Sequence, residues 1–202
     1  MALLNIPVPT SLGPDSNGLM LTPEQFDAIA DWDDSYRYEL VHGVVIVALV
    51  AGEGERCPNE LLGNLLWDYQ QNHALGSCLD HTVYEQYVQT VEGRRLADRV
   101  LWIGLGHRPD VNREFPTIPV EFVSNTARDR RRDYVEKRDE YLEAGAKEYW
   151  VIDRFDRTLT AFFANGEHRV IAAGETYETP LLPGFVLPLE RLFAAADLSG
   201  EQ

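Results

Sequence analysis

Residues 119–153 read PVEFVSNTARDRRRDYVEKRDEYLEAGAKEYWVID, and this stretch decides the fold. Its two ends are rich in β-branched and aromatic residues, which predicts buried strands at 118–124 and 147–153. The charged middle predicts a helix over 127–145, with Gly145 as its C-cap. A strand, a helix and a second strand in this order form a crossover unit.

The sequence on either side of this unit predicts further helices and strands. Thr22, Pro23 and Gln25 have the pattern of a helix N-terminus with a capping box, and residues 36–50 alternate around His42-Gly43 as in a hairpin. We expect helices over 22–32 and 59–75 and strands over 81–91, 94–106 and 157–164. No internal repeat or linker divides the chain, so we expect a flexible lead-in at 1–20, one domain at 21–195 and a tail at 196–202.

The composition is that of a globular protein without a membrane segment. The chain has 202 residues, of which 45% are hydrophobic and 25% charged, as is usual for soluble domains. No apolar run approaches the roughly 20 residues that a membrane helix needs, and the N-terminus lacks the pattern of a secretory signal. Cys57 and Cys78 are too few for a disulfide framework or a thiolate metal site. We therefore expect a cytoplasmic protein with two reduced thiols.

The charge is strongly acidic overall but locally basic. A net charge of −15 argues against a large nucleic-acid surface, because phosphate binding depends on Lys and Arg. Residues 128–138, however, hold six basic and three acidic side chains, and such an island can guide a phosphate to one place. The alternative is that these arginines pair with neighbouring acids on a solvated helix face.

Two acids in the predicted strands need an explanation. Glu121 lies between apolar residues of one strand, and Asp98 comes just before the apolar run VLWIGL of another, with Arg99 between them. A buried carboxylate is costly unless a cation or hydrogen-bond donors compensate it, and two carboxylates at the ends of neighbouring strands can bind a hard ion such as Mg²⁺. The alternative is that each acid faces solvent at a strand end.

Lys137 is a third residue that can belong to such a site. It shares one face of the predicted helix with Asp133 and Tyr141, at spacings of four residues. If this face packs on the sheet, the ammonium can hold a water or stabilise developing negative charge. The alternative is a simple intrahelical pair of Asp133 with Lys137.

Three segments together resemble a known family. They are PVEFVS at 119–124, ARDRRRDYVEKRDEYLEAGAKEYWVID at 127–153 and PLLPGFVLPLERLF at 180–193. The hairpin segment YRYELVHGVVIV resembles the opening of the same family, so the similarity spans roughly residues 20 to 193. The family is that of the Uma-type "putative restriction endonucleases", a branch of the PD-(D/E)XK nuclease superfamily.

The resemblance implies a fold and a site. The fold would be α/β, with a restriction-endonuclease-like core in which helices flank a mixed β-sheet. Asp98 and Glu121 would be the metal carboxylates, with the backbone carbonyl of Val123 as a further ligand, and Lys137 would be the catalytic lysine. The remaining implied roles are support of the ion through water by Glu39 and orientation of Lys137 by Asp133. The implied cofactor is Mg²⁺, with Mn²⁺ as a substitute.

The first metal acid has two candidates. The family usually has a Pro-Asp pair before the metal strand, and here Ala97-Asp98 precedes the strand-like VLWIGL. A literal Pro109-Asp110 exists, but the polar stretch VNREFP follows it. Asp98 is followed by a strand-like stretch, as the resemblance implies for the first metal acid, whereas Asp110 is preceded by the usual proline.

The function implied by the resemblance is a metal-dependent endonuclease that hydrolyses DNA phosphodiester bonds. The arginines that would receive the scissile phosphate are Arg128, Arg130, Arg131 and Arg132. A homodimer would bring two basic islands to one duplex. Two alternatives stay open: a non-catalytic nucleic-acid-binding or regulatory module that retains the nuclease fold, and a nuclease that acts on RNA or single strands.

Overall fold

The structure is a computed structural model that describes residues 9–91, 93–124 and 126–198. By its internal contacts the chain divides into two compact units. The N-terminal unit comprises residues 1–50 and 89–96, and the core unit comprises residues 51–88 and 97–202. The domain boundaries predicted above, at residues 20 and 195, stay a prediction.

The N-terminal unit is built around the predicted hairpin. Strands β3 (Tyr36–Val41) and β4 (Val44–Leu49) are antiparallel and pair from Tyr36–Leu49 to Val41–Val44. The turn residues His42 and Gly43 both have positive φ values, 48° and 78°, as a two-residue type I′ turn requires. The other elements of this unit are β1 (Ser11–Leu12), η1 (Pro14–Ser16), α1 (Pro23–Asp27) and β2 (Asp31–Trp32). The predicted lead-in thus contains β1 and η1 within its described residues, 9–20.

The capping box predicted for the first helix is confirmed. The Thr22 hydroxyl accepts a hydrogen bond from the Gln25 amide, and the Gln25 side chain accepts one from the Thr22 amide. Pro23 occupies the first helical position, where no intrahelical partner for its nitrogen is needed. The helix is shorter than predicted and ends at Asp27.

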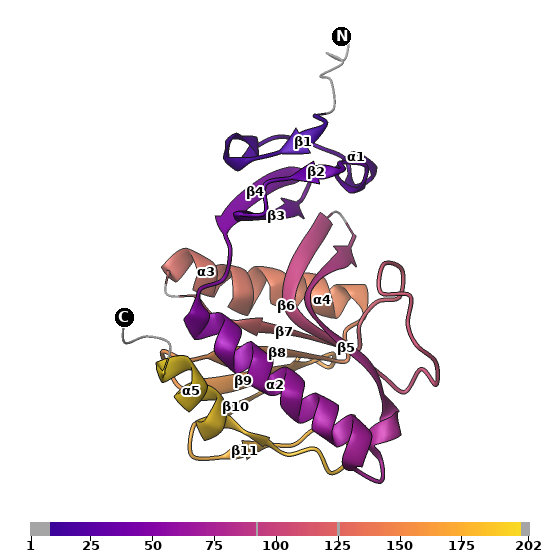
Figure 1. The fold of residues 1–202 in the computed structure, drawn as a ribbon, viewed down its shortest axis with the longest axis vertical. Helices are drawn as coiled ribbons and strands as arrows, with labels where there is room; N and C mark the ends of the chain where they lie inside the picture. The colour runs from indigo at the N-terminus through magenta and orange to yellow at the C-terminus, as the bar shows by residue number, and fades with distance from the viewer. Residues whose placement is uncertain (1–8, 92, 125, 199–202) are drawn as a thin grey trace. The chain divides into compact units, whose positions relative to one another are not determined.

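The core unit contains a mixed sheet, which confirms the predicted fold class. Its strand order is β10–β9–β8–β7–β6, and β5 also pairs with β6 (Figure 1). Strands β7 and β8 are parallel, whereas the β6–β7, β8–β9 and β9–β10 pairs are antiparallel. The strands are β5 (Leu79–Thr90), β6 (Gly93–Ile103), β7 (Ile118–Phe122), β8 (Glu148–Asp153), β9 (Thr158–Phe163) and β10 (His168–Ala172). The end of β5 from residue 89 and the start of β6 up to residue 96 are counted in the N-terminal unit.

The helical segment between β7 and β8 is the predicted crossover. It consists of α3 (Ala127–Arg131), a π-helical turn η3 (Arg132–Glu136) and α4 (Lys137–Ala144). It ends at Gly145, whose φ of 115° fits the predicted glycine C-cap. The parallel pairing of β7 with β8 follows from this connection, because parallel neighbours need a crossover.

Helices cover both faces of the core sheet. On one face α2 (Glu53–Asn72) and α5 (Leu189–Asp197) enclose an apolar cluster that includes Leu66, Trp150 and Phe193. On the other face lies a cluster that includes Trp102, Tyr141 and Tyr149. Figure 1 shows α2 and α5 in front of the sheet and the α3–α4 segment behind it. All five residues of β7 are buried, as expected for a strand with both faces covered.

The remaining short elements complete the core unit. They are η2 (Gly76–Cys78), β11 (Thr176–Tyr177) and β12 (Leu187–Pro188), of which the last two pair with each other. None of the helices in the described part of the chain has the length and apolar content of a membrane-crossing segment.

Candidate active site

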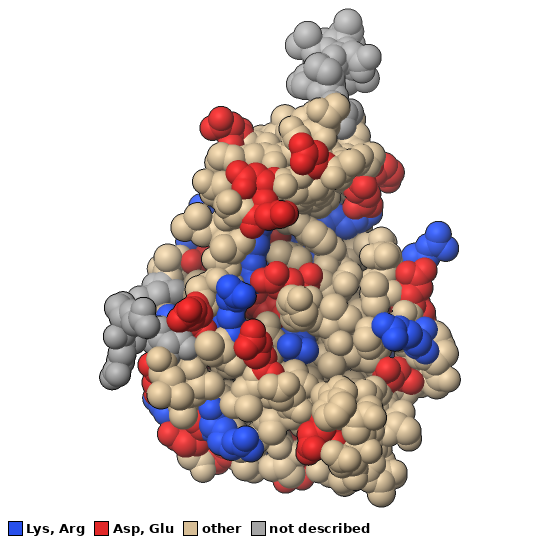
Figure 2. Space-filling view, viewed as in Figure 1, with Lys and Arg blue, Asp and Glu red and all other residues tan. Residues whose placement is uncertain are grey.

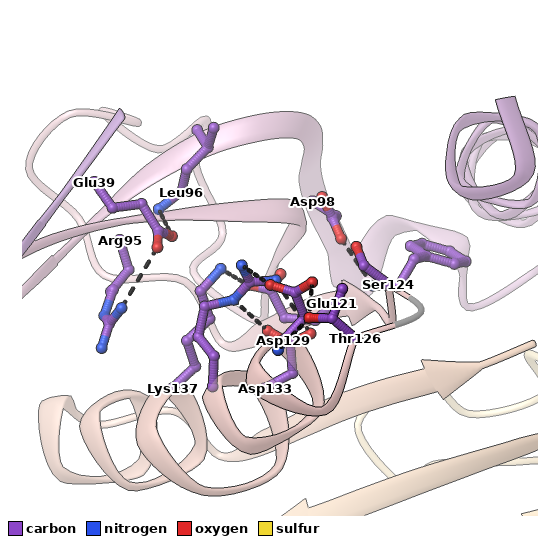
Figure 3. A network of polar contacts seen from close by, with 12 residues as sticks. Glu39, Arg95, Leu96, Asp98, Glu121, Ser124, Thr126, Asp129, Asp133 and Lys137 are labelled. Carbon is purple, nitrogen blue, oxygen red and sulfur yellow. Dashed lines mark hydrogen bonds and ion pairs between the residues drawn. The ribbon is translucent and has the colours of Figure 1, made fainter. Parts of the chain in front are cut away.

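Glu121 and Lys137 meet in the interior of the core unit. Glu121 projects from β7 and is 2% exposed, and Lys137 begins α4 and is 3% exposed. The Lys137 ammonium lies 2.9 Å from Glu121 Oε1, and the Tyr141 hydroxyl donates a hydrogen bond to the same oxygen over 3.1 Å. Figure 3 shows Lys137 and Asp133 extending from the helix toward Glu121. The helix face predicted from the spacing of four does pack on the sheet.

The π-helical turn η3 contains Asp133 and directly precedes Lys137. In η3 the Lys137 amide bonds to the Arg132 carbonyl, five residues back, whereas an α-helix bonds four residues back. Asp133 and Tyr141 are fully buried beside the nearly buried Lys137.

Asp98 lies beside Glu121 at the point where the pairing of β6 with β7 ends. The last paired residues are Arg99 and Val120, and Asp98 and Glu121 come one position further along their strands. Beyond that point Asp98 Oδ2 accepts a hydrogen bond from the Phe122 amide over 2.8 Å. Asp98 is 6% exposed, so neither of the two strand acids faces solvent.

A third acid, Asp133, is buried next to these two. Burial raises the pKa of Asp133, while the nearby Arg132 and Lys137 cations act in the opposite direction and Asp98 raises the pKa further. The Arg132 Nε donates to Asp133 Oδ1 over 2.9 Å. Burial also raises the pKa of Tyr149 well above its usual value, and the carboxylates of Glu121, Asp133 and Asp98 add to this rise. The site therefore concentrates negative charge in a place that excludes water.

The two candidates for the first acid lie in different environments. Asp98 is on a core strand beside Glu121, as described above. Asp110 is exposed in the loop between β6 and β7, where it accepts a hydrogen bond from the Asn112 amide and lies 3.7 Å from the Arg113 guanidinium. This geometry favours Asp98.

Val123 and Glu39 are also predicted to act at the metal ion, and the structure shows other contacts for each. The Val123 amide donates to the Ile152 carbonyl, which extends the pairing of β7 with β8 by one residue. Glu39 belongs to the N-terminal unit, where its carboxylate accepts from the Leu96 amide over 2.9 Å and lies 3.4 Å from Arg95 Nη1. The predicted roles of the Val123 carbonyl and of Glu39 at a metal ion stay predictions.

Three of the four predicted phosphate-binding arginines are paired with acids. Arg130 lies 2.7 Å from both Asp153 and Asp156, and Arg132 contacts Asp129 as well as Asp133. A weaker pair, at 3.5 Å, joins Arg131 to Glu136. Arg128 is exposed and makes no ion pair with any residue that the structure describes. These contacts match the alternative in which arginines pair with neighbouring acids, and phosphate contact stays a prediction.

The surface also has positive and negative side chains next to each other. Figure 2 shows Lys and Arg side chains scattered over the face in view, and most of them lie next to Asp or Glu. No continuous basic surface appears on this face.

The donor set fits a small hard cation. Among the described residues no group of three His, Cys, Asp or Glu side chains could enclose a metal ion. The predicted ligands that lie side by side are two carboxylates, Asp98 and Glu121. Mg²⁺ is commonly held by one or two carboxylates together with substrate phosphate and water, which matches this set. The buried Lys137 adds a positive charge where the two acids otherwise repel each other.

Two features of the site were not predicted. The Tyr141 hydroxyl bonds to Glu121, although the spacing of four from Lys137 already placed it on the right face. Asn59 on α2 donates to the Asp98 carbonyl and accepts from Arg99 Nε, and no motif marks this contact. Burial lowers the pKa of Arg99 to about 10, so the guanidinium stays charged at neutral pH.

Comparisons with known proteins agree with the fold and the sequence motifs. Residues 23–190 match the model of the Uma2 family, described as "Putative restriction endonuclease". Among solved structures the chain is similar to a "putative nuclease belonging to DUF820" from Anabaena variabilis ATCC 29413. That match has a TM-score of 0.70 and 13% identity and covers 87% of this chain and 99% of the other, so it shows the fold alone. A search of curated proteins finds no match.

Proposed function

Because the chain belongs to the Uma2 family, described as "Putative restriction endonuclease", we propose that it is a Mg²⁺-dependent endonuclease that hydrolyses DNA phosphodiester bonds. The observation that supports this most is the burial of Asp98, Glu121 and Lys137 together at the end of the β6–β7 pairing. Buried, mutually repelling acids beside one lysine are costly for stability, and such an arrangement is typical of functional sites.

In this proposal Asp98 and Glu121 hold the divalent cation, with the Val123 carbonyl as a third ligand and Glu39 acting through water. A cation bound there would supply the Lewis-acid chemistry that phosphodiester hydrolysis needs. Mn²⁺ would substitute for Mg²⁺, because it accepts the same oxygen ligands.

Lys137 is proposed as the catalytic residue that acts on the substrate. Its ammonium has three donors, of which one is directed at Glu121 Oε1. Its positive charge would orient an attacking water or stabilise the negative charge that develops on the phosphoryl oxygens. Asp133, on the preceding turn, would keep the Lys137 side chain directed at the site.

Substrate binding is proposed to begin at the basic island. Arg128 is exposed and available for phosphate, and Arg130, Arg131 and Arg132 would have to exchange acidic partners for phosphate. A homodimer would double the number of arginines along one duplex and so reduce the effect of the acidic net charge, −15. The free thiols of Cys57 and Cys78 support a place in the reducing cytoplasm.

A cleavage assay tests the proposal. Supercoiled plasmid, single-stranded DNA and RNA are incubated with the protein and Mg²⁺ or Mn²⁺, beside Glu121→Gln and a matched Glu143→Gln control at an exposed position of α4. The proposal expects metal-dependent nicking of the plasmid by the parent protein and by Glu143→Gln, and none by Glu121→Gln. Cleavage of RNA or single strands alone would favour the corresponding alternative, and DNA binding without cleavage would favour a non-catalytic module.

A further inference from the structure

Asn59 and Arg99 form a buried pair directly behind Asp98. Both side chains are nearly buried, with exposures of 8% for Asn59 and 6% for Arg99. Arg99 Nε donates to Asn59 Oδ1 over 2.7 Å, and Arg99 Nη2 donates to the Asn59 carbonyl over 3.1 Å. Asn59 Nδ2 in turn donates to the Asp98 carbonyl over 2.8 Å. The pair therefore links α2 to the backbone of Asp98.

Arg99 determines which way the Asn59 amide points. A guanidinium has donors only, so it must face the oxygen of the Asn59 side chain. The amide nitrogen is then directed at the Asp98 carbonyl, which needs a donor. The reversed amide would place donors against donors and an oxygen against an oxygen, so one orientation alone satisfies both neighbours.

Asp98 is the place where such support is needed. The last paired residues of β6 and β7 are Arg99 and Val120, and just beyond them the Asp98 carbonyl accepts a hydrogen bond from α2. The Asp98 carboxylate meanwhile accepts from the Phe122 amide. The position of this carboxylate beside Glu121 thus depends on a contact from the helix on the opposite face of the sheet.

The choice of Asn over Asp at position 59 points to the same conclusion. The side-chain partners of Arg99 among the described residues are neutral: Asn59 and the Thr82 hydroxyl, at 3.3 Å from Nη1. A carboxylate at position 59 would compensate the buried guanidinium better than an amide does. It would, however, present an oxygen to the Asp98 carbonyl and lose the donor found there.

The next turn of α2 is also adapted to Arg99. A Cβ at Gly63 would lie 2.6 Å from Arg99 Nη2, closer than side chains approach one another. Glycine at this position lets the guanidinium lie against the helix backbone and reach the Asn59 carbonyl. The helix surface is thus shaped to hold Arg99 against Asn59.

We infer that Asn59, oriented by Arg99, is a positioning residue for Asp98 and thereby sets the geometry of the divalent-cation site. The effect on cation binding rests on the proposed function. The effect on the position of Asp98 does not rest on the proposed function, because hydrogen exchange at the Phe122 amide measures it without any metal.

The decisive variant is Asn59→Asp, which keeps an acceptor for Arg99 and removes the donor to Asp98. Amide hydrogen exchange of the metal-free protein is expected to show faster exchange at Phe122, whose acceptor is the Asp98 carboxylate. The adjacent Val123 amide, which bonds to Ile152, is expected to keep its protection. In calorimetry, Mn²⁺ affinity is expected to fall by roughly 10- to 100-fold, while the thermal unfolding midpoint is expected to stay at or above that of the parent protein.

Thr82→Val is the matched control, because it removes the other side-chain partner of Arg99 and leaves Asn59 intact. It is expected to leave Phe122 exchange and Mn²⁺ affinity unchanged. Asn59→Ala, which also lacks the donor, serves if Asn59→Asp fails to fold. The inference would be overturned if a folded Asn59 variant exchanged the Phe122 amide at the parent rate. It would also be overturned if Thr82→Val lost as much protection at Phe122 as the Asn59 variant does. A parent protein that binds no Mn²⁺ would overturn the proposed metal site alone, since the exchange measurement would still decide the role of Asn59.

Discussion

The Lys137 ammonium lies 2.9 Å from Glu121 Oε1, and both side chains are almost fully buried. A buried ion pair of this kind is a weak source of stability, because desolvation of both charges offsets much of their attraction. The pair joins the helix that follows β7 back to β7 itself. Its burial next to Asp98 and Asp133 supports the proposed metal site.

The first prediction concerns Lys137. Lys137→Met removes the ammonium while keeping much of the apolar side chain, and it leaves Glu121 with the Tyr141 hydroxyl as a neutral donor. We expect kcat for plasmid nicking to fall by roughly 100- to 1,000-fold, because the developing negative charge loses its partner. We also expect the free energy of unfolding to fall by about 3–5 kcal/mol, since a buried carboxylate loses its counter-ion. A variant that stays folded and retains the parent kcat would exclude Lys137 as the catalytic residue.

The second prediction concerns the hydroxyl of Tyr141. Tyr141→Phe removes one donor to Glu121 Oε1 and keeps the aromatic packing against Tyr149. The free energy of unfolding is expected to fall by about 1–3 kcal/mol, because a buried acceptor loses a partner. Chemical denaturation measures this change. A stability equal to that of the parent protein would show that the hydrogen bond contributes nothing to the site.

The third prediction separates the two candidates for the first acid. Asp98→Asn is expected to abolish metal-dependent cleavage, because the amide lacks the negative charge that binds a divalent cation. Asp110→Asn changes the same atoms in an exposed loop and is expected to leave kcat within about twofold of the parent value, as surface substitutions have small effects. The two variants are compared in one nicking assay. If Asp110→Asn lost cleavage and Asp98→Asn kept it, the first metal acid would be Asp110 in the loop.

The fourth prediction concerns the basic island. Arg128 is exposed and Arg130 is bound to the buried Asp153, so the two arginines should respond differently to alanine. Arg128→Ala is expected to lower DNA affinity and to reduce the slope of log affinity against log salt by about one, with unchanged stability. Arg130→Ala is expected to lower the free energy of unfolding by about 1–3 kcal/mol, because Asp153 loses a partner in the interior. Fluorescence anisotropy at several salt concentrations measures DNA affinity, and denaturant unfolding measures stability. Equal changes of affinity and of stability in both variants would contradict the distinction.

The fifth prediction is a pH dependence in the loop between β6 and β7. His107 Nε2 lies 2.9 Å from Glu114, and this hydrogen bond raises the pKa of His107. The hydrogen bond from the Asp110 amide lowers the pKa of Glu114, and the bond with His107 lowers it further. The stabilisation is fully present below the usual histidine pKa of about 6.5 and is lost as the pH rises through the raised value. His107→Gln is therefore expected to be less stable than the parent protein near about pH 6 and equal to it above about pH 8. Denaturant midpoints across this range measure the difference, and a difference independent of pH would contradict the assignment.

The elements with local signals could be predicted from the sequence. The hairpin at His42-Gly43 and the capping box at Thr22 follow from turn and cap chemistry, and both are confirmed. The crossover between β7 and β8 is confirmed because its strands, helix and glycine cap all lie within one continuous stretch.

The parts that depend on distant contacts could not be predicted from residue type alone. Glu148 begins a strand beside Lys147, a context that suggests solvation, yet it is 3% exposed and accepts from the Tyr177 and Thr179 hydroxyls and the Trp150 indole. The partners of Arg130, Asp153 and Asp156, likewise lie far from it in the sequence, as Asn59 lies far from Asp98. The π-helical turn has no sequence signature, since it depends on how the helix fits against the sheet.

The central claim is that Asp98 and Glu121 together bind a divalent cation. Calorimetric titration of the parent protein and of the double variant Asp98→Asn/Glu121→Gln with Mn²⁺ tests it most directly. We expect saturable binding near one ion per chain for the parent protein and no measurable heat of binding for the folded double variant. Identical traces for the two proteins, whether both flat or both saturable, would contradict the claim.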